Sequence, residues 1–206
     1  DTSNLNVVNY NGNSNLCGEN IQAFVNSGTS FAITLSNYKE EKFCGIFTLA
    51  TRCGNDCNWS INESGKLTIS GSGTMIDFNE GTMPWVEKRN SITSIIITDI
   101  TTIGSYAFEG CMNCGLKSIT IPNTVNQIGE GVFKSCINLK SVKLSTQITT
   151  IPKSMFEGCI GLTTFEINDK IETIYDNAFK STGLKQIIIP STVTTIGEYA
   201  FRKLMF

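Results

Sequence analysis

The sequence contains no histidine, only four prolines and few charged residues, and these scarcities exclude several classes of function. Without histidine there is no imidazole to act as a base near neutral pH, and no zinc site that needs a histidine ligand. Charged residues make up 17% of the chain and the net charge is −2, which excludes a basic nucleic-acid-binding surface. Unbroken apolar runs are short, as at Ile95–Ile97, so no segment can span a bilayer.

What is present is typical of a β-rich protein from an oxidising compartment. Eight cysteines stand in a Thr- and Asn-rich chain of 206 residues, long enough for one domain with a small appendage. Two sequons make Asn58 and Asn62 candidate glycosylation sites, although such triplets also occur by chance. The chain begins at Asp1 without a hydrophobic leader, as it would after removal of a signal peptide and as any excised fragment would. We therefore expect an extracellular or cell-surface location.

Five repeat units follow one another in the second half of the chain. Each has an apolar-Phe pair, preceded five residues earlier by isoleucine and three residues before that by another aliphatic residue. The phenylalanines are 22 to 25 residues apart, at Phe108, Phe133, Phe156, Phe179 and Phe201. Each unit also has an apolar-x-x-apolar-x-apolar run, at residues 92–97, 116–121, 139–144, 162–167 and 184–189. Length changes fall only between the phenylalanine and the next run, as expected for loops between packed coils.

The pattern within one unit predicts its local structure. Alternation with period 2 in the apolar run predicts a short strand with one buried face. Spacings of three to five around the isoleucine and phenylalanine predict a tight bend or a single helical turn instead of a strand. One such coil cannot bury its own apolar side, so coils stacked about 4.8 Å apart are expected to share one core. The sequence thus predicts a curved solenoid with a parallel sheet along one face.

The segment Leu116–Cys136 reads L-x-x-I-x-I-P-x-x-V-x-x-I-G-x-x-V-F-x-x-C, which resembles the BspA-like class of leucine-rich repeats. Later units depart from this motif, because Pro152 and Tyr175 stand where it has glycine. The resemblance covers about residues 92–201. It implies an α/β or mostly-β fold, a right-handed leucine-rich-repeat solenoid with the parallel sheet on its concave face. Members occur on the surfaces of mucosal bacteria and parasitic protists, which implies adhesion or binding to host or matrix proteins.

The residues before the repeats resemble the amino-terminal β cap of such modules. Alternating residues at 59–61 and 67–69 predict two strands joined by a hairpin turn at 62–65. Trp59 and Trp85 are expected to cover the apolar end of the first coil. We therefore expect a β-rich extension at 1–52, with strand-like runs at 31–35 and 44–49, a hairpin cap at 53–91, and five repeats at 92–206.

The cysteines fall into two groups. Cys111, Cys136 and Cys159 each follow their unit's phenylalanine by three residues, which favours a row of free, buried thiols. A metal site is disfavoured because the single C-x-x-C, Cys111 with Cys114, has no histidine to complete four ligands. A redox role is disfavoured because this C-x-x-C lies in a repeat loop. The candidate disulfides outside the array, whose connectivity the sequence leaves open, are Cys17–Cys44 and Cys53–Cys57.

Nothing in the sequence assembles a catalyst. The carboxylates of Asp77, Glu80 and Glu87 are scattered before the repeats, and no nucleophile is paired with a base. The run Gly71–Gly73 lies in a hairpin pattern and not at a strand-to-helix turn, so it is not a phosphate-binding loop. We expect no enzyme activity, no cofactor and no metal.

The solenoid surface remains as the place for a function. Between the buried positions of each strand run, lysines recur beside small hydroxyl residues in columns that face outwards. Such a strip could be a docking face for an extended protein or glycan. It could equally reflect the preference of outward strand positions for β-formers and solubilising lysines. The candidate ligand-binding residues are Lys117, Lys140, Lys143, Glu166 and Lys185.

We therefore expect a non-catalytic secreted or cell-surface protein that binds a protein or glycan on a host cell, in the matrix or on a neighbouring subunit. Neither nucleic acid nor membrane insertion is expected. The alternative is a structural subunit that polymerises through the solenoid ends. It is motivated by residues 201–206, where no polar cap follows the last unit and homo- or hetero-assembly could cover the apolar edge.

Overall fold

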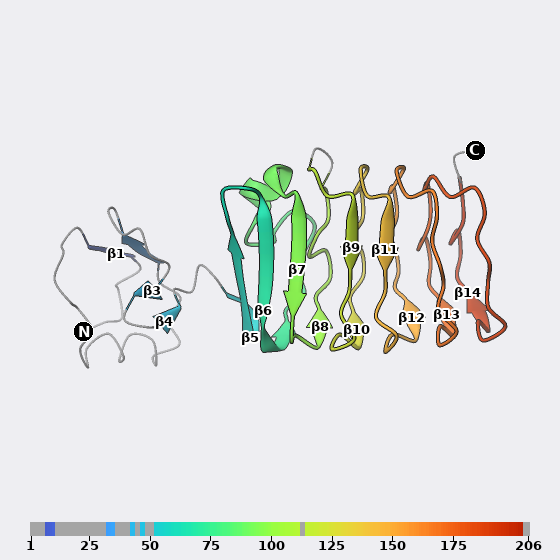
Figure 1. Cartoon of the computed structure of the whole chain (residues 1–206), viewed down its shortest axis with the longest axis horizontal. Coiled ribbons are helices and arrows are strands. Elements are labelled where there is room, and N and C mark those ends of the chain that lie inside the picture. Colours follow the sequence, from blue (N-terminus) through green and yellow to red (C-terminus); the bar gives the residue numbers. More distant parts are fainter. Residues whose placement is uncertain are drawn as a thin grey trace. The chain divides into compact units, whose positions relative to one another are not determined.

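The computed structural model describes strands at residues 7–10, 32–35, 42–43 and 46–47, and the stretches 52–111 and 114–203 (Figure 1). The chain divides into two compact units, Asp1–Arg52 and Cys53–Phe206. In the first unit β1 (Val7–Tyr10) pairs in parallel with β2 (Ala32–Leu35), and β3 (Lys42–Phe43) pairs antiparallel with β4 (Ile46–Phe47). Strands thus overlap both predicted runs, whereas the predicted Cys17–Cys44 pair lies outside the described residues.

The second unit opens with the predicted hairpin. β5 (Arg52–Ile61) and β6 (Lys66–Met75) pair antiparallel, with Trp59 opposite Ile69. The N–H of Gly65 donates to the carbonyl of Asn62 over 3.0 Å and closes the turn. Gly65 has a φ of 79°, and a Cβ there would lie 1.9 Å from the Ser91 carbonyl oxygen, so the turn requires glycine.

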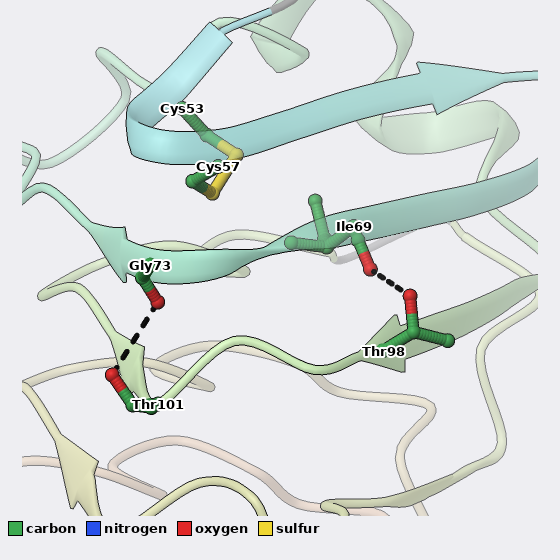
Figure 2. The surroundings of a disulfide bond; sticks show 6 residues. All are labelled: Cys53, Cys57, Ile69, Gly73, Thr98 and Thr101. Carbon is green, nitrogen blue, oxygen red and sulfur yellow. Dashed lines mark hydrogen bonds between the residues drawn. A yellow bond between two sulfur atoms is a disulfide. The ribbon is translucent and has the colours of Figure 1, made fainter.

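A bulge in β5 lies between Asn55 and Cys57, and a disulfide joins Cys57 to Cys53 across it (Figure 2). The facing strand leaves room for the bulge through Gly71, where a Cβ would lie 1.7 Å from the Asp56 carbonyl oxygen. Gly71 therefore serves close backbone approach within the hairpin.

Strand β6 starts two parallel ladders. Its first half pairs with β7 (Ser94–Thr98), and Thr74, near its C-terminal end, pairs with Thr102 of β8 (Thr102–Ile103). Figure 2 shows the hydroxyls of Thr98 and Thr101 donating to carbonyl oxygens of β6, each over 3.4 Å. The cap therefore sets the register of the first coil on two of its sides.

The first ladder continues from the apolar runs only in the early units. β9 (Ser118–Thr120) and β11 (Ser141–Lys143) pair in parallel and lie beside β7 on one face (Figure 1). The prediction of strands within 162–167 and 184–189 is wrong: these residues are described by the structure and form no strand. In the fourth unit the strand position holds Phe165, whose ring centroid lies 5.1 Å from those of both Phe156 and Phe179. That ring is larger than the isoleucine or valine found there in the units with strands, but the fifth unit also lacks a strand and has Ile187 at this position.

The second ladder corrects the prediction of a bend around the isoleucine that recurs five residues before each repeat phenylalanine. That isoleucine lies in a two-residue strand in every unit, and the bend begins directly after it. β10 (Gln127–Ile128) pairs with β8, and β12 (Thr150–Ile151), β13 (Thr173–Ile174) and β14 (Thr195–Ile196) pair in order, all in parallel. The only helix among the described residues is a 3₁₀-helix, η2 (Val86–Ser91).

A column of stacked aromatic rings forms the centre of the core. Trp85 begins it, stacking on Phe108 at 6.0 Å and donating its Nε1–H to the Ala107 carbonyl over 2.9 Å. Trp59 contacts Trp85 edge-on at 5.6 Å, so the two tryptophans cover the first coil as predicted. Four of the five repeat phenylalanines are at most 2% exposed, and Phe201 is half-buried. The unit is therefore a mostly-β solenoid of five coils with a hairpin cap.

Candidate functional site

The outward side chains of the five apolar runs form one surface, which we call the strand face. In β9 and β11 the central residue is buried and its two neighbours are exposed, so the alternation predicted from the sequence is present. Every outward residue of the five runs is exposed except Ser94, which is half-buried. The three columns are Thr93, Lys117, Lys140, Thr163 and Lys185; Ser94, Ser118, Ser141, Thr164 and Gln186; and Ile96, Thr120, Lys143, Glu166 and Ile188.

Lysines dominate the charge of the strand face. All four are exposed, and none takes part in an ion pair among the described residues. The register sets Lys143 beside Thr120, and the N–H of Lys140 donates to the Lys117 carbonyl over 2.8 Å. Because neighbouring strands lie about 4.8 Å apart, the lysines of the second and third coils form one patch. Glu166 is the single carboxylate among the outward residues of the five runs.

A second charged column lies elsewhere on the coils and was missed in the sequence. It consists of the residues directly after the repeat phenylalanines, which alternate in sign over the first four coils: Glu109, Lys134, Glu157, Lys180 and Arg202. Lys134 pairs with Glu80, Lys180 pairs with Glu157 at 2.7 Å, and Arg89 lies 3.9 Å from Glu109. The alternation was readable from the repeat alignment, but the pairing partners come from other coils and from the cap.

The ion pairs of this second charged column shift the pKa values of its residues. Partial burial is the largest single effect and acts to raise the pKa of Glu157. The hydrogen bonds from Lys180 and Ser154, together with the positive charges of Lys180 and Lys134, outweigh it, so the pKa is lowered. The hydrogen bond to Glu80 raises the pKa of Lys134. These charges neutralise one another within the protein, whereas the strand-face lysines are left to interact with solvent or a partner.

The predicted row of buried thiols is present. The Sγ–H of Cys136 donates to the Phe108 carbonyl over 3.1 Å, and that of Cys159 donates to the Phe133 carbonyl over 2.9 Å. Each thiol therefore bonds to the preceding coil. Burial raises the pKa of Cys159 to about 12 and also raises the pKa of Cys136, so both remain protonated near neutral pH and are weak nucleophiles. Among the residues that the structure describes, the free cysteines are Cys111, Cys114, Cys136 and Cys159, all buried.

The scattered carboxylates have structural surroundings. Asp77 Oδ1 accepts hydrogen bonds from the N–H and the hydroxyl of Ser105, both over 2.7 Å, and these bonds lower the pKa of Asp77. Glu80 pairs with Lys134, and Glu87 is exposed in the first turn of η2. Within residues 52–111 and 114–203 no group of three or more His, Cys, Asp or Glu residues is arranged to hold a metal ion.

The two sequons differ in their surroundings. Asn58 is half-buried within β5, opposite Ser70 of β6. Asn62 is exposed in the hairpin turn, where its Oδ1 accepts hydrogen bonds from the Ser64 hydroxyl over 2.8 Å and from the Lys66 N–H over 2.9 Å.

Stacked coils with parallel ladders, a phenylalanine column and a hairpin cap define a leucine-rich-repeat solenoid. The family model for the BspA type leucine rich repeat region matches residues 87–205 in six copies, where the phenylalanine spacing identifies five units. The chain belongs to this family. The family is generally non-catalytic, and its fold is consistent with a protein-binding role.

Solved structures with similar chains include leucine-rich repeat proteins from Eubacterium ventriosum (21% identity, TM-score 0.46, 73% of this chain and 62% of that one) and Bacteroides ovatus (26%, 0.48, 71% and 37%). A third is a leucine rich cell surface protein from Faecalibacterium prausnitzii (23%, 0.48, 72% and 50%). The chain thus spans between 37% and 62% of the length of these proteins. No curated protein matches this chain. Among the described residues, no helix has the length and apolar character needed to cross a membrane.

Proposed function

We propose that this protein is a non-catalytic binding protein that attaches to a macromolecule outside the cell through its strand face. The observation that carries the proposal is the group of four exposed, unpaired lysines on that face, in a chain whose net charge is −2. Coil stacking turns these separate positions into one surface. Adhesion to a host cell or matrix is the role that this surface and the family resemblance support best.

An extracellular or cell-surface location is part of the proposal. The Cys53–Cys57 disulfide supports it, because disulfides persist in oxidising compartments. Asn62 is the better glycosylation candidate, since its side chain is exposed in a turn whereas Asn58 lies half-buried in a strand. Glycosidase treatment of the protein purified from its source, followed by mass spectrometry, tests both assignments.

The proposed binding is tested by reversing the charge of the patch. The variant Lys117→Glu, Lys140→Glu, Lys143→Glu is compared with the wild type for attachment to cultured epithelial cells and to immobilised matrix proteins. The matched control, Lys88→Glu, Lys153→Glu, Lys170→Glu, makes the same charge change at exposed lysines away from the strand face. Circular dichroism first establishes an unchanged fold. Loss of attachment only in the strand-face variant supports the proposal, and equal attachment by both variants refutes it.

The alternative function, assembly through the solenoid ends, has one observation in its favour. Several of the exposed large apolar side chains belong to the last two coils: Tyr175, Ile188, Ile189, Ile196 and Tyr199. Size-exclusion chromatography with light scattering separates the two functions. A chain that stays monomeric over the accessible concentration range excludes assembly, whereas growing oligomers favour it.

A further inference from the structure

We infer that the ligand of the strand face is an anionic polysaccharide, an extended chain bearing sulfate or carboxylate groups. This inference rests on the proposed function and adds the chemical class of the partner. It concerns mainly the second and third coils, where Lys117 and Lys140 directly precede the adjoining strands β9 and β11 and Lys143 ends β11.

Charge and hydrogen-bonding capacity favour such a ligand. The outward residues of these two coils include three lysines, two serines and one threonine, and no carboxylate. Ser118 lies directly beside Ser141 in the parallel register, so a row of hydroxyls runs between the lysine columns. Lysine ammonium groups interact with sulfate or carboxylate as point charges, and the hydroxyls can donate to the same anions or bond to sugar hydroxyls.

The same residues disfavour a protein partner. Protein interfaces are enriched in aromatic residues, methionine and arginine, and they are depleted in lysine and serine. Their binding energy also concentrates in buried aromatic or arginine anchors. The outward positions of the second and third coils have none of these residues, and the apolar outward residues of the strand face, Ile96 and Ile188, lie in the first and last coils.

The fourth coil limits the patch on one side. Glu166 follows Lys143 in the third column, and the first column has Thr163 at that coil in place of a lysine. A polyanion is therefore repelled from the fourth coil and held by the second and third. Replacing Glu166 with lysine extends the column of positive charge, whereas a merely solubilising strip gives no reason for a gain in binding.

The test measures affinity for heparin, a sulfated polysaccharide, by surface plasmon resonance with the full chain over a series of salt concentrations. The strand-face triple variant is expected to lose at least about tenfold in affinity, because each exposed charge contact contributes modestly and reversal adds repulsion. The control triple variant at residues 88, 153 and 170 is expected to stay within about twofold of the wild type. Glu166→Lys is expected to bind about two- to fivefold more tightly, and all affinities should fall as salt rises.

The inference is also tested by comparing heparin with other ligands and by comparing the two triple variants. Dextran, a neutral polysaccharide, and an oligoglutamate peptide of matched charge should both bind at least about tenfold more weakly than heparin, because dextran lacks anionic groups and the peptide lacks a sugar chain. Equal binding of the peptide, or equal losses in the two triple variants, overturns the inference. In the cell assay, strand-face-dependent attachment that survives enzymatic removal of sulfated glycans overturns it while the proposed binding function stands. Heparin binding through the strand face without strand-face-dependent attachment to cells would refute the proposed binding function, while the inferred ligand class would stand.

Discussion

Within a single coil, the repeat phenylalanine is the residue that joins it to both neighbours. The ring of Phe156 is fully buried, and its centroid lies 5.7 Å from that of Phe133 and 5.3 Å from that of Phe179. A cavity at this position cannot be filled by a small shift of one coil, because each coil is tied to the next by main-chain hydrogen bonds such as Phe156 N–H to the Ala178 carbonyl at 2.8 Å.

Phe156→Ala is therefore expected to lower the free energy of unfolding by about 3–5 kcal/mol, measured by chemical denaturation. Phe201→Ala is the matched control and should cost clearly less, because Phe201 is only half-buried and stacks on Phe179 alone among the repeat phenylalanines. A loss below about 1 kcal/mol for Phe156→Ala would contradict its place in the column.

The cysteines lead to a second expectation at this scale. Native protein treated with iodoacetamide at mildly alkaline pH should leave Cys136 and Cys159 unmodified, because both thiols are buried and their raised pKa keeps them protonated. Unfolding should make both reactive. Peptide mapping without reduction should recover Cys53 joined to Cys57. A recovered bond between Cys136 and Cys159 would show that the thiol row is not free.

Among the structural elements, the turn around the phenylalanine was the least visible in the sequence. In every coil the residues two before and two after the phenylalanine have positive φ values, from 54° to 76°. Such values favour glycine, yet these positions hold Tyr106, Gly131, Ser154, Asn177 and Tyr199 before the ring, and Gly110, Ser135, Gly158, Ser181 and Lys203 after it. In the first four coils the N–H groups of this turn donate to carbonyls of the next coil, so stacking holds the turn in its left-handed conformation.

Left-handed strain in the turn predicts that exchanging serine for glycine and glycine for serine there changes the free energy of unfolding in opposite directions. Ser181→Gly should raise the free energy of unfolding by about 0.5–1 kcal/mol, because relief of left-handed strain exceeds the added chain entropy. Gly158→Ser should lower it by a similar amount, through backbone strain alone, since the nearest atom to an added Cβ is 3.5 Å away. As a control, Ser141→Gly in β11 should be destabilising in thermal unfolding. The same sign for Ser181→Gly and Ser141→Gly would argue against strain in the turn.

Over the whole molecule, the cap and the coils share one core. The buried apolar side chains of the described residues form a single cluster from Cys53 to Ala200, covered at one end by Trp85 and the hairpin. Solenoids of this kind gain stability from contacts between neighbouring coils. Every residue of that cluster belongs to the second unit.

A chain of residues 53–206 is therefore expected to fold without residues 1–52. It should unfold in one cooperative transition, with a denaturation midpoint close to that of the full chain, when both are followed by tryptophan fluorescence. The probe is suitable because Trp59 and Trp85 both lie in the second unit. A non-cooperative transition, or a chain that precipitates under conditions in which the full protein is soluble, would show that the first unit is needed.

The sequence by itself determined the features that recur with a short period. The repeat length, the buried phenylalanine column, the thiol row and the exposed lysine columns all follow from residue spacing within one unit, because burial on one face is a local demand that each coil meets alike. The hairpin cap follows from the alternation of residues at 59–61 and 67–69. Tertiary structure decided the rest. The second ladder, the left-handed turns filled by several residue types, and the packing of Phe165 between Phe156 and Phe179 each depend on atoms in a neighbouring coil. The ion pairs of Lys134 and Lys180 likewise depend on carboxylates in the cap or in another coil. Such partners are set by how coils stack in three dimensions, which the pattern inside one repeat does not specify.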